Sequence, residues 1–213
     1  MDLDRLKHSL SVARKMVEIG KAYYLSDKKL HSLNGDTLHI WGLDIKNVFM
    51  EKDIDVIMPE FPIRAESKYE KFESILEKYL TSGILNNNSI VVAHSIGNAY
   101  FIRFCKEKKF VPKAYIAVAP GAVYEYSSSR NDYIVEVKSQ AYVKQDAFDY
   151  IQNVNCDKYC LYSDEDDNNK EKFTRFIKDT NSKGMYLKNY NHFDGYHNII
   201  KIPELVELID SLL

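Results

Sequence analysis

Residues 89–93 read SIVVA, an almost continuously apolar run that a helical pattern follows directly. A strand with one face in water alternates apolar and polar residues, whereas an inner strand of a parallel sheet is covered on both faces and is apolar throughout. Residues 98–109 carry the apolar spacing of a helix, and residues 113–120, KAYIAVAP, form a second buried run. The two runs therefore predict neighbouring inner strands of a parallel sheet.

The rest of the chain continues this alternation of strand and helix patterns. The further expected strands cover residues 54–62, 158–163 and 184–189, and the further expected helices cover 66–83, 143–154, 168–180 and 203–213. Such alternation implies crossover connections and a mostly parallel sheet with helices on both faces. We therefore predict one α/β domain over residues 28–213, preceded by an amphipathic helical extension over residues 1–27.

Composition restricts the classes of partner. The formal net charge of −2 argues against nucleic acid or a membrane surface bound by bulk electrostatics. No stretch approaches the roughly 18 consecutive apolar residues of a membrane-spanning helix, and the first residues lack the apolar core of a secretion signal. Cys105, Cys156 and Cys160 form an odd set without zinc-site spacing. We expect reduced thiols in a cytoplasmic protein.

Ser95 stands where the first buried run meets its helix. Together with Ala93 and Gly97 it forms a small-x-Ser-x-Gly pattern, which is typical of the nucleophile elbow between a strand and a helix. Small residues are needed at 93 and 97 because the turn brings the strand and helix backbones together. The turn holds the serine in a strained conformation and presents its hydroxyl to the site.

Two further strand ends carry the partners that a nucleophilic serine needs. The strand at 158–163 is followed by SDEDDNN, which contains several carboxylates, and the strand at 184–189 is followed by YNHFDGYHN, which contains His192. Most of these acids would also suit a solvated loop, and a lone histidine is usually a surface residue. The chain order serine, acid, histidine is nevertheless that of α/β-hydrolases, with each member after a different strand.

The segments VVAHSIGNAYFIRF, LYSDEDD and NHFDG resemble the small serine-hydrolase family that includes retinoblastoma-binding protein 9 and bacterial YdeN-like proteins. The resemblance covers about residue 31 to the C-terminus. It implies an α/β-hydrolase-like three-layer sandwich with little or no cap, and a triad of Ser95, Asp166 and His192. The family pattern Ser-x-x-Asp selects Asp166, with Asp164 and Asp167 as alternatives, and its His-Phe dipeptide selects His192 over His197.

The family's first strand ends in His-Gly and supplies part of the oxyanion hole. The matching positions are His31 and Ser32, preceded by the polar segment SDKKL, and residues 21–25, KAYYL, are a rival for this strand. We expect the backbone N–H of Ile96 and one near Ser32 or Leu33 to form the oxyanion hole. His94, beside the nucleophile, is expected to be structural.

Residues 5–26 also resemble the opening helix of HD-type metal phosphohydrolases, in which the residue matching His8 would bind metal. That chemistry needs a His-Asp dipeptide on a later helix, which the sequence lacks, so we expect a packing helix. We expect no metal and no cofactor, because the chain has no glycine-rich phosphate loop and no ligands at metal spacing.

These features predict a serine hydrolase that acts on a small ester, thioester or amide through an acyl-enzyme. The alternative is a catalytically impaired hydrolase-fold protein that binds a protein partner or a small ligand, because the first strand looks degraded. The substrate and the oligomeric state stay open at this point.

Overall fold

The computed structural model describes residues 29–33, 49, 52, 54–57, 59, 68–120, 123, 143–163, 170–188 and 203–213. The helix expected over residues 1–27, the domain boundary that follows it and residues 124–142 are outside these ranges. For these regions the expectations above stay predictions.

Six strands form one parallel sheet in the described part of the chain. Their order is β2-β1-β3-β4-β5-β6, and all five neighbouring pairs are parallel. The strands are β1 (Lys29–Leu33), β2 (Asp55–Ile57), β3 (Ser89–His94), β4 (Ala114–Val118), β5 (Asp157–Tyr162) and β6 (Lys183–Tyr186). The predicted α/β fold with a mostly parallel sheet is therefore confirmed.

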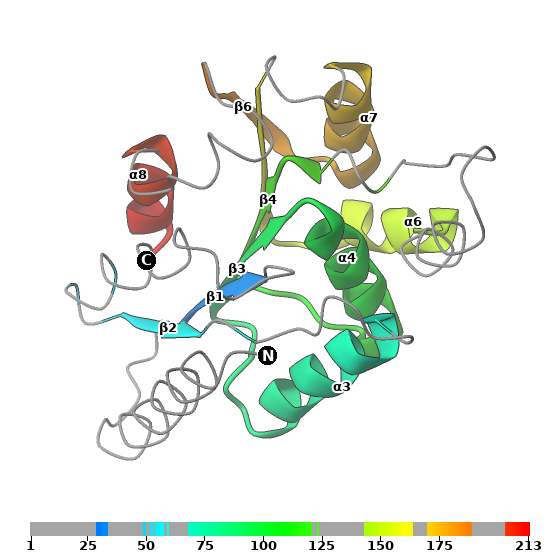
Figure 1. Ribbon diagram of the computed structural model, residues 1–213, viewed down its shortest axis with the longest axis vertical. Helices are drawn as coiled ribbons and strands as arrows, with labels where there is room; N and C mark the ends of the chain where they lie inside the picture. The colour runs from blue at the N-terminus through cyan, green and yellow to red at the C-terminus, as the bar shows by residue number, and fades with distance from the viewer. Residues whose placement is uncertain are drawn as a thin grey trace, which may run out of the picture.

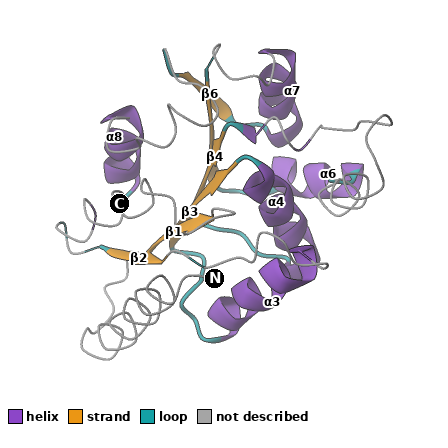
Figure 2. Cartoon of the chain, in the orientation of Figure 1, coloured by secondary structure: helices purple, strands orange, loops and turns teal. Residues whose placement is uncertain are grey.

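Helices cover both faces of the sheet (Figures 1 and 2). One face is covered by α3, α4, α6 and α7, and the other by α8. The helices are α3 (Lys68–Thr81), α4 (Ile96–Lys108), α6 (Gln145–Asn153), α7 (Lys170–Thr180) and α8 (Pro203–Leu212). Each lies within one residue range predicted as a helix or, for α4, begins two residues before it. None of the described helices is long and apolar enough to cross a membrane.

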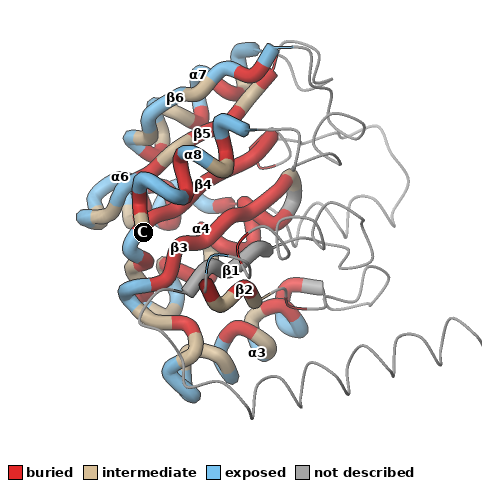
Figure 3. Tube along the Cα trace, turned by 90° about the vertical axis from the view of Figure 1, so that its left-hand side faces the viewer, coloured by how far each residue is buried: buried red, intermediate tan, exposed pale blue. Residues whose placement is uncertain are grey.

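The inner strands β3 and β4 are buried along their whole length (Figure 3). Successive side chains of a strand point to opposite faces, and the two apolar clusters follow this alternation. Val91 and Ala93 join the cluster under α3, α4 and α6, whereas Ile90 and Val92 join the cluster under α8. On β4, Tyr115 faces the α4 side. The continuous apolar sequence of the two strands is thus explained by burial on both faces.

The first strand along the chain is β1, whose sequence KLHSL mixes polar residues with two leucines. It lies between β2 and β3 and pairs with both, with His31 opposite Ile57 on one side and Val91 on the other. The strand therefore includes His31 and Ser32, as the family resemblance implies. The rival segment at 21–25 is outside the described residues.

Aromatic rings fix α4 against α3. The ring of Tyr100 lies 5.9 Å from that of Tyr69 and 5.3 Å from that of Phe72, between centroids. Burial raises the pKa of Tyr100 to about 12, so its hydroxyl is neutral at physiological pH. Helix α4 is thereby held by apolar packing on the face that it turns to α3.

The three cysteines are free thiols, as the sequence predicts. Cys105 on α4 and Cys160 on β5 are buried, and Cys156 is partly exposed. Burial raises the pKa of all three thiols, to about 11 for Cys156. Each is therefore protonated near neutral pH.

Candidate active site

Ser95 lies between the end of β3 and the start of α4, as the sequence predicts. Its backbone angles are φ 50° and ψ −122°, a region that residues with a side chain seldom occupy. Strain of this kind costs about 1–3 kcal/mol and is concentrated at functional sites. The neighbouring Ala93 and Gly97 are both buried. The strained turn and its small neighbours have the form of a nucleophile elbow.

The backbone of Ser95 is held on both sides by hydrogen bonds. Its N–H donates to the carbonyl oxygen of Val118, at the end of β4, at 3.0 Å. Its carbonyl oxygen accepts from the N–H of Asn98 at 3.1 Å. Because one bond reaches the next strand and the other lies within the first turn of α4, the turn is fixed to both elements.

Asn98 and Tyr115, which were not predicted from the sequence, form further hydrogen bonds that hold the backbone of this turn. Asn98 is fully buried, and its Nδ2 donates to the carbonyl oxygens of Ser95 at 2.9 Å and Val118 at 3.2 Å. Its Oδ1 accepts a hydrogen bond of 2.8 Å from the hydroxyl of Tyr115. In the sequence, Asn98 could be noticed as a polar residue on the otherwise apolar start of α4. Its contact with Tyr115 on β4 could not, because that contact depends on how the helix packs on the sheet.

The predicted oxyanion residues lie at the same edge of the sheet. Ile96 is the first residue of α4, and the N–H groups of the first helical turn have no acceptor within the helix. Ser32 and Leu33 are the last two residues of β1, and they pair in register with Val92 and Ala93 of β3. The end of β1 and the start of α4 therefore both lie beside the turn that carries Ser95.

His94 is the last residue of β3 and is buried, with 7% of its surface exposed. It pairs in register with Val118 of β4. The structural role expected for His94 stays a prediction.

Asp166 and His192 are outside the described residues, as are the alternative acids Asp164 and Asp167 and the alternative histidine His197. One described stretch stops at Ser163, just after β5, and the next stops at Lys188, just after β6. Ser163 is buried. The predicted acid and base therefore follow the carboxyl ends of two observed strands, and the triad itself stays a prediction.

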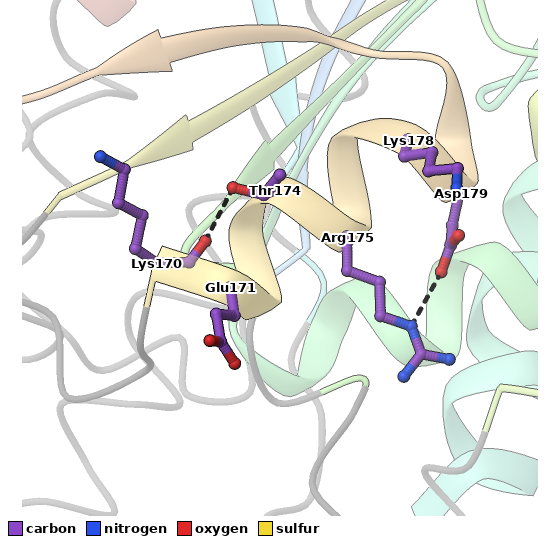
Figure 4. A pocket seen from close by; sticks show the side chains of 6 residues that line it. All are labelled: Lys170, Glu171, Thr174, Arg175, Lys178 and Asp179. Atoms are coloured by element: carbon purple, nitrogen blue, oxygen red, sulfur yellow. Dashed lines mark hydrogen bonds and ion pairs between the residues drawn. The ribbon is translucent and has the colours of Figure 1, made fainter.

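A separate hollow of about 600 Å³ lies along α7 (Figure 4). Its described lining residues all belong to that helix, and they include Lys170, Thr174, Arg175 and Asp179. Thr174 donates to the carbonyl oxygen of Lys170 at 3.0 Å, and Arg175 pairs with Asp179 at 3.3 Å. This surface carries side chains of both charges, and Ser95 is not among its described lining residues.

Comparison with solved structures finds proteins of similar fold. The ydeN gene product from B. subtilis is 14% identical and has a TM-score of 0.67, with 86% of this chain and 99% of that chain covered. A bromoperoxidase from Bacillus anthracis is 15% identical with a TM-score of 0.65, covering 88% of this chain and 93% of that one. A monoacylglycerol lipase from Paleococcus ferrophilus is 11% identical with a TM-score of 0.65, covering 87% and 95%.

Comparison at the level of sequence finds no such match. No family model matches the chain, and no curated protein matches it. The likeness to the solved structures is thus one of architecture, and it extends over nearly their whole length. The chain has an α/β-hydrolase-like fold.

Proposed function

We propose that the protein is a serine hydrolase whose nucleophile is Ser95. The observation that carries this proposal is the strained backbone of Ser95, φ 50° and ψ −122°, at a strand-to-helix turn of an α/β-hydrolase-like sheet. At the junction of a strand and a helix, this conformation places the serine hydroxyl near the N-terminal end of the helix, as a nucleophile requires.

In the proposed reaction, His192 takes the proton of the Ser95 hydroxyl as its oxygen attacks a carbonyl carbon. Asp166 orients the imidazole and stabilises its positive charge. The bond between the carbonyl carbon and the leaving group then breaks. The leaving group takes the proton from His192 as it departs. Water then attacks the acyl-enzyme with His192 again as the base, which releases the acid and restores Ser95.

The negative oxygen of the tetrahedral intermediate would accept hydrogen bonds from the N–H of Ile96 and from an N–H at the end of β1, near Ser32 or Leu33. One such donor is commonly responsible for about 3 kcal/mol of barrier lowering. The proposed reaction uses only groups of the chain and water, and requires neither a metal nor a cofactor.

The proposed substrates are small esters, thioesters or amides. Esters have the strongest support, because the structural neighbours include a monoacylglycerol lipase and carboxylesterases.

A binding protein with an impaired hydrolase fold is the alternative. Ser32 stands where the related family has glycine, which favours this alternative. Against it, β1 is present in the sheet and pairs with β3 along five residues, so the first strand is not lost. The alternative predicts a wild-type protein that binds ligands but does not react at Ser95.

The proposal is tested with p-nitrophenyl acetate and a fluorophosphonate probe. We expect the wild type to hydrolyse the ester and to be labelled at Ser95, and Ser95→Ala to lose both reactions while keeping its circular dichroism spectrum. Ser82→Ala, which changes an exposed serine after α3, is the matched control and should react as the wild type does. Labelling of Ser95→Ala would identify another nucleophile, and an unreactive wild type would favour the binding protein.

A further inference from the structure

Asn98 and Tyr115 form a buried polar pair directly behind Ser95. Asn98 is 0% exposed and Tyr115 is 1% exposed. Burial of polar groups costs free energy unless they form hydrogen bonds with each other or with a third group. We propose that this pair is a positioning device that aims the backbone N–H of Ile96 into the oxyanion hole. The inference rests on the proposed function, since it assigns these residues a role in the same reaction.

The contacts determine the orientation of the Asn98 amide. Its Nδ2 lies within hydrogen-bond distance of two carbonyl oxygens, those of Ser95 and Val118. A reversed amide would place Oδ1 against both oxygens and leave the Tyr115 hydroxyl facing an NH₂ group. The hydroxyl of Tyr115, which donates to Oδ1 at 2.8 Å, therefore holds the amide in its donating orientation.

This orientation fixes the peptide unit that joins Ser95 to Ile96. The carbonyl oxygen of Ser95 accepts two hydrogen bonds from Asn98, one from Nδ2 at 2.9 Å and one from the backbone N–H at 3.1 Å. A trans peptide is planar, and its N–H points opposite to its C=O. Holding the Ser95 carbonyl toward Asn98 therefore turns the Ile96 N–H away from Asn98 and toward the outside of the turn.

The same amide ties the turn to β4. Because Nδ2 also donates to Val118, the carbonyls of Ser95 and Val118 are held by one group. The N–H of Ser95 reaches Val118 as well. The strained φ of Ser95 and the direction of the following N–H are thus set together by the sheet.

A purely structural role would have a different signature. If the pair only satisfies its own polar groups, replacement of both partners by apolar groups of similar shape should be nearly neutral. The double variant Asn98→Leu with Tyr115→Phe makes this replacement, and it leaves the Val118 bond to the Ser95 N–H in place. The Ser95 carbonyl then keeps only the hydrogen bond from the backbone N–H of residue 98, so a loss of rate in this folded variant is expected from a less firmly oriented Ser95–Ile96 peptide.

The experiment measures kcat and KM with p-nitrophenyl acetate, the rate of fluorophosphonate labelling, and the urea midpoint. The variants are Tyr115→Phe, Asn98→Asp and the double variant. Tyr150→Phe is the matched control, because its hydroxyl donates to the Phe110 carbonyl at the far end of α4. We expect kcat to fall about 10-fold to 100-fold in the double variant with KM nearly unchanged, since the oxyanion develops only in the transition state.

Asn98→Asp keeps the size of the side chain but cannot donate to the two carbonyls, so it should lose at least as much rate. Tyr115→Phe should lose several-fold, and Tyr150→Phe should keep the wild-type kcat. A folded double variant with wild-type kcat would overturn the inference and leave the proposed function intact. Should the double variant fail to fold, wild-type kcat in Tyr115→Phe would overturn it in the same way. A wild type that is not labelled at all would overturn the proposed function and this inference with it.

Discussion

Ser95 and Ala119 follow neighbouring strands, and both have positive φ angles, 50° and 45°. The N–H of Ser95 donates to Val118 on β4, and the N–H of Ala119 donates to Leu161 on β5, each at 3.0 Å. At both strand ends the chain therefore leaves the sheet through a conformation that favours glycine, held by a hydrogen bond to the next strand. Both turns are therefore tied to the neighbouring strand at the carboxyl end of the sheet.

The strain at Ser95 predicts an unusual order of stabilities. Ser95→Gly should have a free energy of unfolding about 1 kcal/mol higher than Ser95→Ala, because glycine accepts φ 50° and the relief of about 1–3 kcal/mol exceeds its larger unfolded-state entropy. Urea denaturation of the two inactive variants measures the difference. The same pair of substitutions at Ser82, which lacks a positive φ, should give the opposite order. Equal stabilities at Ser95 would mean that its backbone is not strained.

Asp166 and His192 are predicted to act together with Ser95. Asp166→Asn should lower kcat by roughly four orders of magnitude with p-nitrophenyl acetate, because the imidazole loses the acid that orients it and stabilises its charge. His192→Ala should be at least as severe.

The neighbouring residues supply the controls for this prediction. Asp164→Asn and His197→Ala should keep most of the wild-type kcat. A large loss in Asp164→Asn with an active Asp166→Asn would transfer the role of the acid to Asp164.

Lys158 closes the end of α6 and is predicted to be a major contributor to stability. Its side chain is buried, and Nζ donates to the carbonyl oxygens of Ile151, Gln152 and Val154 at 3.0–3.1 Å. Lys158→Met should lower the free energy of unfolding by about 2 kcal/mol, because three carbonyls at the helix end lose a charged donor. Urea denaturation provides the measurement.

Lys183→Met is the control for Lys158. Lys183 is exposed and pairs with Asp157 at 3.6 Å, and an exposed ion pair contributes little. Its urea midpoint should stay close to that of the wild type. A urea midpoint of Lys158→Met close to that of the wild type would contradict this prediction, and would indicate that water replaces the lysine as the donor at the helix end.

Glu107 should make stability depend on pH. Burial alone would raise its pKa, but hydrogen bonds from Tyr69 at 2.5 Å and Arg103 at 2.8 Å, with the charge of Arg103, lower the pKa below its usual range. A carboxyl with a lowered pKa in the folded state stabilises the fold above its unfolded pKa of about 4.3, and the benefit is lost as pH falls through the folded value.

Glu107→Gln should therefore be less stable than the wild type at pH 7, and the difference should become smaller as the pH falls towards 3. Urea midpoints at pH 7, 5 and 3 measure it. Glu77→Gln, at a more exposed position that pairs with Lys108, should show a smaller gap at pH 7. A gap of constant size across this pH range would contradict the lowered pKa.

The sequence predicts the inner part of the fold well because burial on two faces leaves a continuous apolar pattern, as in β3 and β4. It predicts β1 poorly, because KLHSL has no such pattern and becomes a strand only through its pairing with β2 and β3. The turn at Ser95 is predictable from local sequence, since its small neighbours stand at a fixed spacing.

The Asn98–Tyr115 pair is a different case. The two residues are 17 positions apart, and their contact follows from the way α4 lies on β4. Local sequence carries no record of that packing, so a positioning role could be recognised only once the helix and the sheet were placed together.

The reactivity of the buried thiols can be used to measure opening of the core. Cys105 and Cys160 are fully enclosed, and a protonated, enclosed thiol reacts slowly with alkylating reagents. Alkylation of Cys105 and Cys160 would therefore require that the core opens, whereas the partly exposed Cys156 can be reached in the folded protein. The native cysteines make it possible to follow local opening by mass spectrometry without introducing a label.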